Sequence, residues 1–376
     1  MTSLATYLDY NATSPIRTSV RKAIMRSMDY FGNPSSMHSF GRTTRNLIEE
    51  ARKNVAVLLG CQPECVIFTS GGTEANALAI NGWGNKRFLT SSIEHASVLK
   101  VKYGKRIAVK QSGVIDLLEL DRLLSESNEP TLVTVMLANN ETGVIQPIID
   151  VVRLAKAHGA IVHCDAIQAV GKIKINLCEL GVDSLAVSAH KIGGPAGVGA
   201  LLLTNPNAKF LPTLLGGDQE WTRRAGTENI IGIIGFGAAA NEVNGEIGEV
   251  ERLAGLRDRI EQIFCEKVPR LVIFGKLTAR LPNTSCFAVP DVMAQTLLIG
   301  LDLANIAVSS GSACSSGNVA PSHVLVAMGA DFLASSAIRV SFGWASTEHD
   351  VARFIDVFLS LINRFDLVSK RKLASA

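Results

Sequence analysis

The chain has 376 residues, of which 47% are apolar, and its formal net charge is +3 at pH 7. That apolar content suffices for a large buried core, and the length predicts two or three domains. The charge is near balance and the one basic cluster, Lys370-Arg371-Lys372, lies in the tail, so we expect no nucleic-acid partner. No apolar run reaches the ~18 residues that span a bilayer, and the first residues lack the order of a signal peptide. These features predict a globular cytoplasmic protein with no membrane partner.

The cysteine content also argues for a reducing compartment. Seven cysteines are scattered along the chain, an odd number that does not predict a disulfide framework. Cys61 and Cys65 have no second Cys or His pair at zinc-ligand spacing, so we expect no metal site. Most of the others lie in apolar strand or helix patterns, where cysteine packs as a small hydrophobic residue. These are Cys164, Cys178, Cys265 and Cys286.

From residue 66 to about 204, short apolar runs alternate with helical patterns, which is typical of βαβ units around a mainly parallel sheet. Several of these runs end in polar residues. The runs cover residues 66–70, 88–91, 131–138, 160–164 and 184–189, and they lead into Gly71-Gly72-Thr73-Glu74, Glu94-His95, Asn139-Asn140, Asp165 and His190-Lys191. Because ligands bind outside the carboxyl ends of strands in open α/β sheets, we expect one site assembled from distant segments.

Local signals predict several helix boundaries. Ser14-Pro15 predicts a helix start ahead of Val20, and Gly60 predicts a helix end. Asp116 and Thr347 each begin a pattern typical of an N-terminal cap.

The pattern of predicted elements changes after about residue 245, where a long charged helix leads into shorter strands and helices. We therefore expect a large domain at residues 14–250. Residues 251–376, together with the N-terminal segment 1–13, are expected to form a smaller α/β domain.

Two glycine-containing segments could bind phosphate. Gly71-Gly72-Thr73-Glu74 follows a strand and opens a helix, so its backbone N–H groups and the positive end of the helix dipole suit a phosphate, although an ordinary glycine-rich turn is the alternative. Residues 235–240 superficially fit a dinucleotide fingerprint. Their alanine-rich continuation favours a buried helix, but a nucleotide-binding oxidoreductase remains an alternative function.

Two further segments carry reactive groups. Lys191 enters the expected ligand site, where apolar surroundings could lower its pKa and permit a Schiff base. Asp165 near it could pair with the pyridinium nitrogen of pyridoxal phosphate, or the two could form a structural salt bridge. Cys314 lies in a Ser- and Gly-rich stretch with few side chains able to bury a thiol. An accessible thiolate there suits a nucleophile.

Motifs along nearly the whole chain resemble those of the cysteine desulfurases, in order and approximate spacing. The motifs are Leu8-Asp9-Tyr10-Asn11-Ala12-Thr13, Gly32-Asn33-Pro34-Ser35-Ser36, Gly72-Thr73-Glu74-Ala75-Asn76, Glu94-His95, Asn139-Asn140-Glu141-Thr142-Gly143, Asp165-Ala166-Ile167-Gln168, Ser188-Ala189-His190-Lys191, Arg224-Ala225-Gly226-Thr227-Glu228-Asn229, Gly311-Ser312-Ala313-Cys314 and Arg339-Val340-Ser341-Phe342-Gly343. The chain looks like the subgroup with the longer cysteine loop, within the class V aminotransferase branch of fold-type I pyridoxal phosphate enzymes. The resemblance implies a large domain with a mainly parallel seven-stranded sheet flanked by helices.

The resemblance also implies a set of roles. Lys191 would be joined to pyridoxal phosphate, Asp165 would hold the pyridinium nitrogen, Gln168 would face the phenolic oxygen, and His95 would stack on the ring and move protons. The phosphate would be held by Gly72, Thr73, Ser188 and His190, with Thr227 reaching it from the second subunit of a homodimer. Asn140 would lie beside cofactor and substrate, and Arg339 would bind the carboxylate of L-cysteine.

The implied reaction removes sulfur from L-cysteine, giving alanine and a persulfide on Cys314 that passes to a sulfur-acceptor protein, for iron-sulfur cluster assembly or thiolation. An aminotransferase or a lyase acting on another amino acid, including selenocysteine, needs Lys191 but not Cys314. A sulfur-transfer scaffold without catalysis is a further alternative.

Overall fold

The computed structural model describes residues 5–84, 86–246, 248–310 and 321–374. Its larger part contains a seven-stranded sheet in the order β2-β8-β7-β6-β5-β3-β4. Pairs that include β8 are antiparallel and the other pairs are parallel. The strands are β2 Val66–Thr69, β3 Arg87–Ser91, β4 Lys105–Ile107, β5 Thr131–Thr134, β6 Ile161–Asp165, β7 Ser184–Ser188 and β8 Gly199–Leu203. The expected mainly parallel seven-stranded sheet is confirmed.

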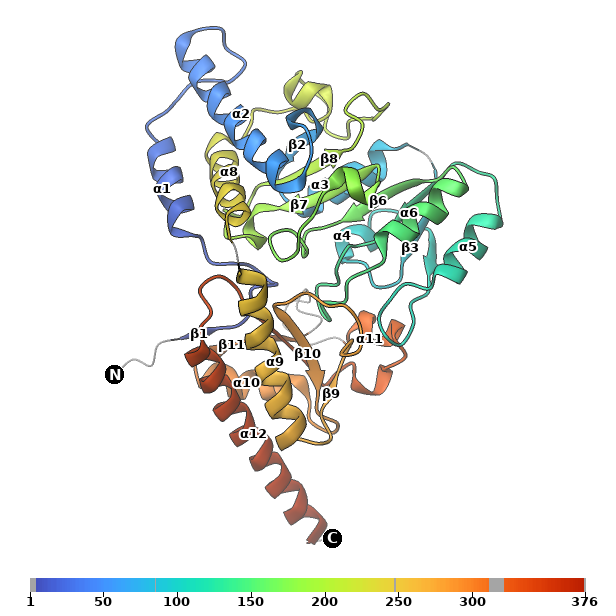
Figure 1. Ribbon diagram of the computed structural model, residues 1–376, viewed down its shortest axis with the longest axis vertical. Coiled ribbons are helices and arrows are strands. Elements are labelled where there is room, and N and C mark those ends of the chain that lie inside the picture. The colour runs from blue at the N-terminus through green and yellow to red at the C-terminus, as the bar shows by residue number, and fades with distance from the viewer. Residues whose placement is uncertain (1–4, 85, 247, 311–320, 375–376) are drawn as a thin grey trace.

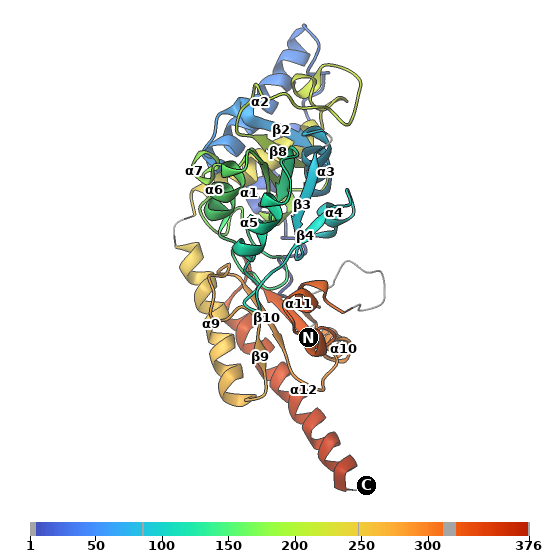
Figure 2. The same ribbon diagram turned by 90° about the vertical axis from the view of Figure 1, so that its right-hand side faces the viewer.

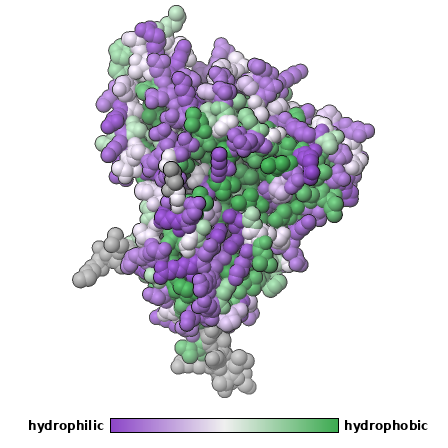
Figure 3. Space-filling model, viewed as in Figure 1, coloured by the Kyte–Doolittle hydropathy of each residue, from purple (hydrophilic) through white to green (hydrophobic). Residues whose placement is uncertain are grey.

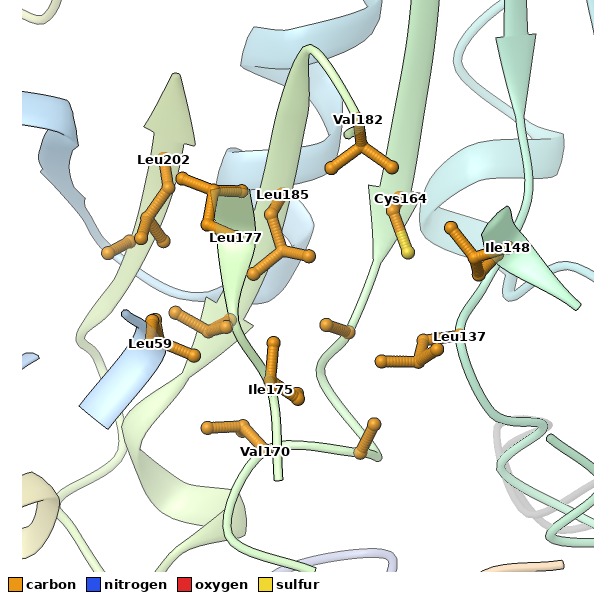
Figure 4. Packing of buried hydrophobic residues seen from close by; sticks show 14 of the residues in the cluster. Leu59, Leu137, Ile148, Cys164, Val170, Ile175, Leu177, Val182, Leu185 and Leu202 are labelled. Atoms are coloured by element: carbon orange, nitrogen blue, oxygen red, sulfur yellow. The ribbon is translucent and has the colours of Figure 1, made fainter. Parts of the chain in front are cut away.

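Helices cover both faces of this sheet (Figures 1 and 2). They are α1 Thr18–Ser27, α2 Ser39–Leu59, α3 Gly72–Gly82, α4 Ala96–Leu99, α5 Leu117–Ser125, α6 Ile148–Ala157, α7 Leu177–Leu180 and α8 Ile230–Asn244, with the 3₁₀ turns η1 Pro63–Cys65, η2 Ala189–Lys191 and η3 Gln219–Thr222. Alternate strand residues face opposite sides. Val66 and Phe68 pack with α2 and α8, whereas Ile67 between them packs with α3. Figure 4 shows part of the larger of these two hydrophobic clusters.

The smaller part lies at one end of the sheet and has its own hydrophobic cluster (Figure 2). Its four-stranded sheet has the order β12-β13-β10-β9, and β1 pairs with β11. Its elements are β1 Thr6–Tyr7, α9 Glu249–Lys267, β9 Val272–Ile273, β10 Thr284–Ala288, α10 Ala294–Leu303, β11 Ile306–Ala307, β12 Ser309–Ser310, α11 His323–Ala327, η4 Asp331–Leu333, β13 Ala337–Ser341 and α12 Glu348–Ala374. Because α9 and the N-terminal Leu8 both contribute to this cluster, we propose the division between the two domains near residue 250, with the N-terminal segment in the smaller one, as the sequence predicts.

Several expected boundaries are confirmed. Gly60 ends α2 in the left-handed conformation, with φ of 64°. Asp116 caps α5 through the N–H groups of Leu118 and Glu119. Thr347 and Asp350 exchange hydrogen bonds at the N-terminus of α12.

Two expectations are wrong. The first helix begins at Thr18 rather than at Ser14-Pro15, because the Ser14 N–H donates to His190 O and Arg17 is still extended. Cys178 and Cys265 are exposed rather than packed as hydrophobic residues, since each lies beside a residue that takes the buried position of its helix, Leu177 and Phe264.

The alternative nucleotide site at residues 235–240 is not supported by the geometry. These residues lie inside α8, not at its N-terminus. A Cβ added to Gly237 would lie 2.5 Å from Ala51 Cα. The glycine therefore permits close packing of α8 against α2, which explains the pattern without a phosphate.

The surface in Figure 3 is largely polar, with a hydrophobic area at the centre right. In the ranges that the structure describes, no helix combines the length and apolar content needed to cross a membrane.

Candidate active site

A cavity of about 290 Å³ lies where the predicted strand ends meet. Nearly every described residue to which we assigned a role lines it. These residues are Gly72, Thr73, His95, Asn140, Asp165, Gln168, Ser188, His190, Lys191 and Arg339. Asn11, Ala12, Ser97 and Met136, to which the sequence assigned no role, line it as well.

One wall of the cavity has the features of a phosphate cradle. Gly72 begins α3, and a Cβ added to it would lie 2.2 Å from Ile167 Cδ1 and 3.5 Å from Ser188 Cβ. No larger residue fits there without displacing Ile167. Thr73 in the first turn and the buried Ser188 supply hydroxyl groups beside the helix N-terminus. This combination of N–H groups, hydroxyls and a helix dipole suits a phosphate group.

Asp165 ends β6 and is buried at the cavity wall. Its Oδ1 accepts from the Ile167 N–H at 2.9 Å, and its Oδ2 accepts from Asn76 Nδ2 at 2.8 Å. Burial raises the pKa of this carboxyl. The hydrogen bonds from Ile167 and Asn76 oppose the rise, as do the charges of the nearby His95 and Lys191. A cationic ring nitrogen placed here would favour the carboxylate further.

His95 caps α4 and faces the same cavity. Its Nδ1 accepts from the Ser97 N–H at 3.1 Å and lies 2.8 Å from Ser97 Oγ. Burial, and then Lys191 and His323, lower the pKa of His95, against the opposing effect of Asp165. The ring is therefore neutral near pH 7, with its proton on Nε2.

Lys191 ends the 3₁₀ turn η2 that follows β7. Its Nζ donates to Asn11 O at 2.5 Å and to Ala12 O at 2.8 Å. Neighbouring His190 has a pKa lowered to about 4 by burial and by Lys191. The amine is thus held at the cavity by two backbone carbonyls of the N-terminal segment.

A second lysine, which the sequence did not single out, lies behind this wall. Lys172 Nζ donates to Gln168 Oε1 at 2.9 Å and to Asn11 Oδ1 at 2.7 Å. Gln168 Nε2 in turn donates to Asn11 O at 2.9 Å. Burial lowers the pKa of Lys172 well below its ordinary value, followed by the effects of Lys191 and Arg339.

Arg339 reaches the cavity from β13 of the smaller part, and its residue is 3% exposed. Nη1 donates to Asn140 O at 2.9 Å and Nη2 to Asp9 Oδ1 at 2.7 Å. Its buried Nε has no hydrogen-bond partner among the described residues. A buried guanidinium with a donor left over fits a carboxylate ligand.

Two of the predicted residues are not among those that line this cavity. Thr227 lines a separate cavity of about 230 Å³, together with Arg224 and Glu220. Glu220 is fixed there by a buried two-point ion pair with Arg52, at 2.8 Å for both bonds. Cys314 lies outside the described residues.

The sequence missed residues that support the site from behind. His163 and Asn76 contact each other and Asn76 contacts Asp165, while Asn11 and Lys172 support Gln168. The one available signal was that His163 precedes Asp165 by two positions and so faces the same side of the strand. Among the residues that the structure describes, no group of three or more His, Cys, Asp or Glu is placed to hold a metal ion.

The comparisons with known proteins agree with this geometry. Residues 6–354 match the family model described as aminotransferase class-V. A protein named cysteine desulfurase IscS from Dictyoglomus turgidum is 41% identical over 97% of this chain and 96% of its own. The X-ray structure of a NifS-like protein from Rickettsia africae has a TM-score of 0.89 at 37% identity, covering 96% of this chain and all of that one. A structure titled SspA in complex with cysteine has a TM-score of 0.78 at 30% identity, with coverages of 90% and 98%. The chain therefore belongs to the class V aminotransferase family, in its cysteine desulfurase branch.

Proposed function

We propose that this protein is a pyridoxal phosphate-dependent cysteine desulfurase, which converts L-cysteine to L-alanine and carries the sulfur as a persulfide on Cys314. The observation that carries the proposal is the meeting of Lys191, Asp165, His95 and Arg339 at one cavity with a phosphate cradle in its wall. Relatives over nearly the whole chain are named cysteine desulfurase, and one similar structure is titled as a complex with cysteine.

The residues fit pyridoxal phosphate. Gly72, Thr73 and Ser188 suit its phosphate, and the carboxylate of Asp165 suits its ring nitrogen. When bound, the cofactor supplies an aldehyde for a lysine amine and a ring that takes up the electron pair left when a Cα–H bond breaks. Lys191 Nζ is the amine at the cavity, and it also accepts the Cα proton of the substrate.

Substrate binding relies on Arg339 and Asn140. The guanidinium binds the substrate carboxylate, and because it is held by Asp9 and the Asn140 carbonyl it needs little ordering on binding. His95 lines the cavity with its hydrogen on Nε2, and it can deliver a proton to the carbon fragment that leaves as alanine.

Sulfur transfer needs no outside oxidant. The Cys314 thiolate attacks the sulfur of the substrate, so an S–S bond forms as the Cβ–S bond breaks. The electron pair of the broken bond stays with the carbon fragment, which is protonated and leaves as alanine. Cys314 then holds the persulfide sulfur until an acceptor protein removes it.

The homodimer is part of the proposal. Thr227 is exposed and lines a separate cavity with Glu220 and Arg224 rather than the cavity of its own chain, which leaves it available to the phosphate site of a second copy. The sulfur acceptor, in iron-sulfur cluster assembly or thiolation, and a cytoplasmic location are proposed on the same basis as the function.

Single-turnover chemistry tests the function. With L-cysteine and no reductant, the protein should release one alanine per subunit, and mass spectrometry should find one added sulfur on the peptide that contains Cys314. Cys314→Ala should form neither product above background, whereas Cys265→Ala, which removes an exposed thiol, should match the parent. Alanine release by Cys314→Ala at the parental rate would instead support a lyase or aminotransferase.

A further inference from the structure

A chain of hydrogen bonds runs behind Asp165 through the centre of the larger part. Trp83 Nε1 donates to Ser184 Oγ at 3.1 Å, and Ser184 Oγ lies 3.0 Å from His163 Nδ1. His163 Nε2 lies 3.0 Å from Asn76 Oδ1, and Asn76 Nδ2 reaches Asp165 Oδ2 at 2.8 Å. None of these residues except Asp165 lines the cavity.

The same Asn76 amide serves a second branch. Its Nδ2 also donates to Ser97 Oγ at 2.9 Å. Ser97 Oγ lies 2.8 Å from His95 Nδ1, which already accepts from the Ser97 N–H. One hydrogen of the Asn76 amide nitrogen thus goes directly to Asp165, and the other goes to the Ser97 hydroxyl that contacts His95.

The two ends of this series of hydrogen bonds constrain which group donates and which accepts at each contact. An indole nitrogen can only donate, and an ionised carboxylate can only accept. If Trp83 donates to Ser184 Oγ, the Ser184 hydroxyl can in turn donate a hydrogen bond to His163 Nδ1. His163 then carries its own hydrogen on Nε2 and donates to Asn76 Oδ1, which leaves Asn76 Nδ2 to donate to Asp165. This arrangement gives every member of the series a hydrogen-bond partner.

Burial keeps the His163 ring neutral. His163 and Ser184 are 0% exposed, as is Asn76. Burial lowers the pKa of His163 to about 3, so the ring stays uncharged at neutral pH and offers one donor and one acceptor. A reversed Asn76 amide would turn its oxygen toward the Asp165 carboxylate. His163 prevents this by donating a hydrogen bond to that oxygen in its present position.

We propose that His163 is a positioning residue which, through Asn76, fixes the Asp165 carboxylate and orients the Ser97 hydroxyl toward His95 Nδ1 for the cofactor ring. The inference rests on the proposed function for its link to pyridoxal phosphate. The hydrogen-bond chain itself can be tested without the cofactor.

Two sets of variants separate this role from a structural one. His163→Phe keeps a flat buried ring but removes the donor and the acceptor, whereas His163→Gln keeps one of each. Thr134→Val is the matched control, because Thr134 pairs with His163 across β5 and β6 and its buried hydroxyl has no hydrogen-bond partner among the described residues. The folded state of each variant is checked by circular dichroism.

The experiment has two readouts. Long-range ¹H–¹⁵N NMR of the cofactor-free wild type should find His163 neutral with its hydrogen on Nε2, and His95 in the same tautomer. In cofactor titrations followed by absorbance, His163→Phe should bind pyridoxal phosphate about tenfold more weakly and shift the visible band, while His163→Gln and Thr134→Val stay near wild type. An Nδ1–H tautomer at His163 would overturn the proposal, as would wild-type affinity and spectrum in folded His163→Phe. Failure of the wild type to bind pyridoxal phosphate would instead overturn the proposed function. The NMR result would still test the series of hydrogen bonds behind Asp165.

Discussion

Arg339 Nη2 donates to Asp9 Oδ1 at 2.7 Å, an ion pair that ties strand β13 to the segment after β1. The pair lies next to the cavity, and the Asn140 carbonyl accepts from the other terminal nitrogen of the guanidinium. The side chain is therefore held in place before any substrate arrives.

Arg339→Lys should raise KM for L-cysteine by about tenfold or more, because an ammonium group cannot make the planar two-point contact with a carboxylate. Steady-state kinetics of alanine formation measure the effect. Asp9→Asn keeps the guanidinium and removes only its charged partner, so its KM should rise less than that of Arg339→Lys. Equal kinetics for Arg339→Lys and the parent would contradict the assignment of the carboxylate site.

Lys172→Met should weaken the binding of pyridoxal phosphate, because Gln168 loses the donor that orients its amide. Asn11 loses a hydrogen bond at the same time. We expect about a tenfold loss of affinity in absorbance titrations. Lys174→Met is the matched control, since Lys174 is two positions away and exposed. Unchanged affinity in Lys172→Met would show that Gln168 needs no support from this lysine.

Glu94→Gln should change the pH dependence of stability. Glu94 is 0% exposed, its Oε1 accepts from the Met136 N–H at 2.6 Å, and burial followed by Asp165 raises its pKa well above the ordinary value. Above the ordinary pKa of glutamate, the unfolded chain loses this proton while the folded chain keeps it, so the wild type loses stability as pH rises.

The glutamine variant lacks this loss. Its free energy of unfolding relative to wild type should increase from pH 5 to pH 8, by at most about 1.4 kcal/mol per pH unit. Urea unfolding at the two pH values measures the difference. A relative stability that stays constant or falls over this interval would mean that Glu94 ionises normally in the folded protein.

Phe358→Ala should destabilise the smaller part by about 3–5 kcal/mol, through lost burial and the cavity left behind. The Phe358 ring is buried, with its centroid 4.3 Å from that of Phe264 and 5.5 Å from that of Phe287. Leu367→Ala on the same helix should cost little, because Leu367 is 61% exposed. Denaturant unfolding compares the two, and similar losses would argue against this aromatic core.

The parts of the fold that the sequence predicted well are those where one local rule dominates. Polar residues after buried strands placed Asp165 and Lys191 at one sheet edge, and Gly60 needed only its own left-handed conformation to end a helix. The start of α1 was missed because a tertiary contact, from Ser14 to His190, overrides the local Ser-Pro signal.

The supporting residues of the site could not be predicted in the same way. Lys172 and His163 act through partners far away in the sequence, Asn11 and Asn76. A lysine or histidine in such a pattern gives no sign of the group that will accept its hydrogen bond. Only the packed structure brings the donor and the acceptor together.

The central claim is that Lys191 is the cofactor lysine, and peptide mass spectrometry after borohydride reduction tests it most directly. Protein incubated with pyridoxal phosphate and then reduced should carry the pyridoxyl group on the peptide that contains Lys191, and the visible absorbance should be lost on reduction. Lys172, buried behind the same wall, should remain unmodified. An unmodified Lys191, or a pyridoxyl group found on another lysine, would contradict the account.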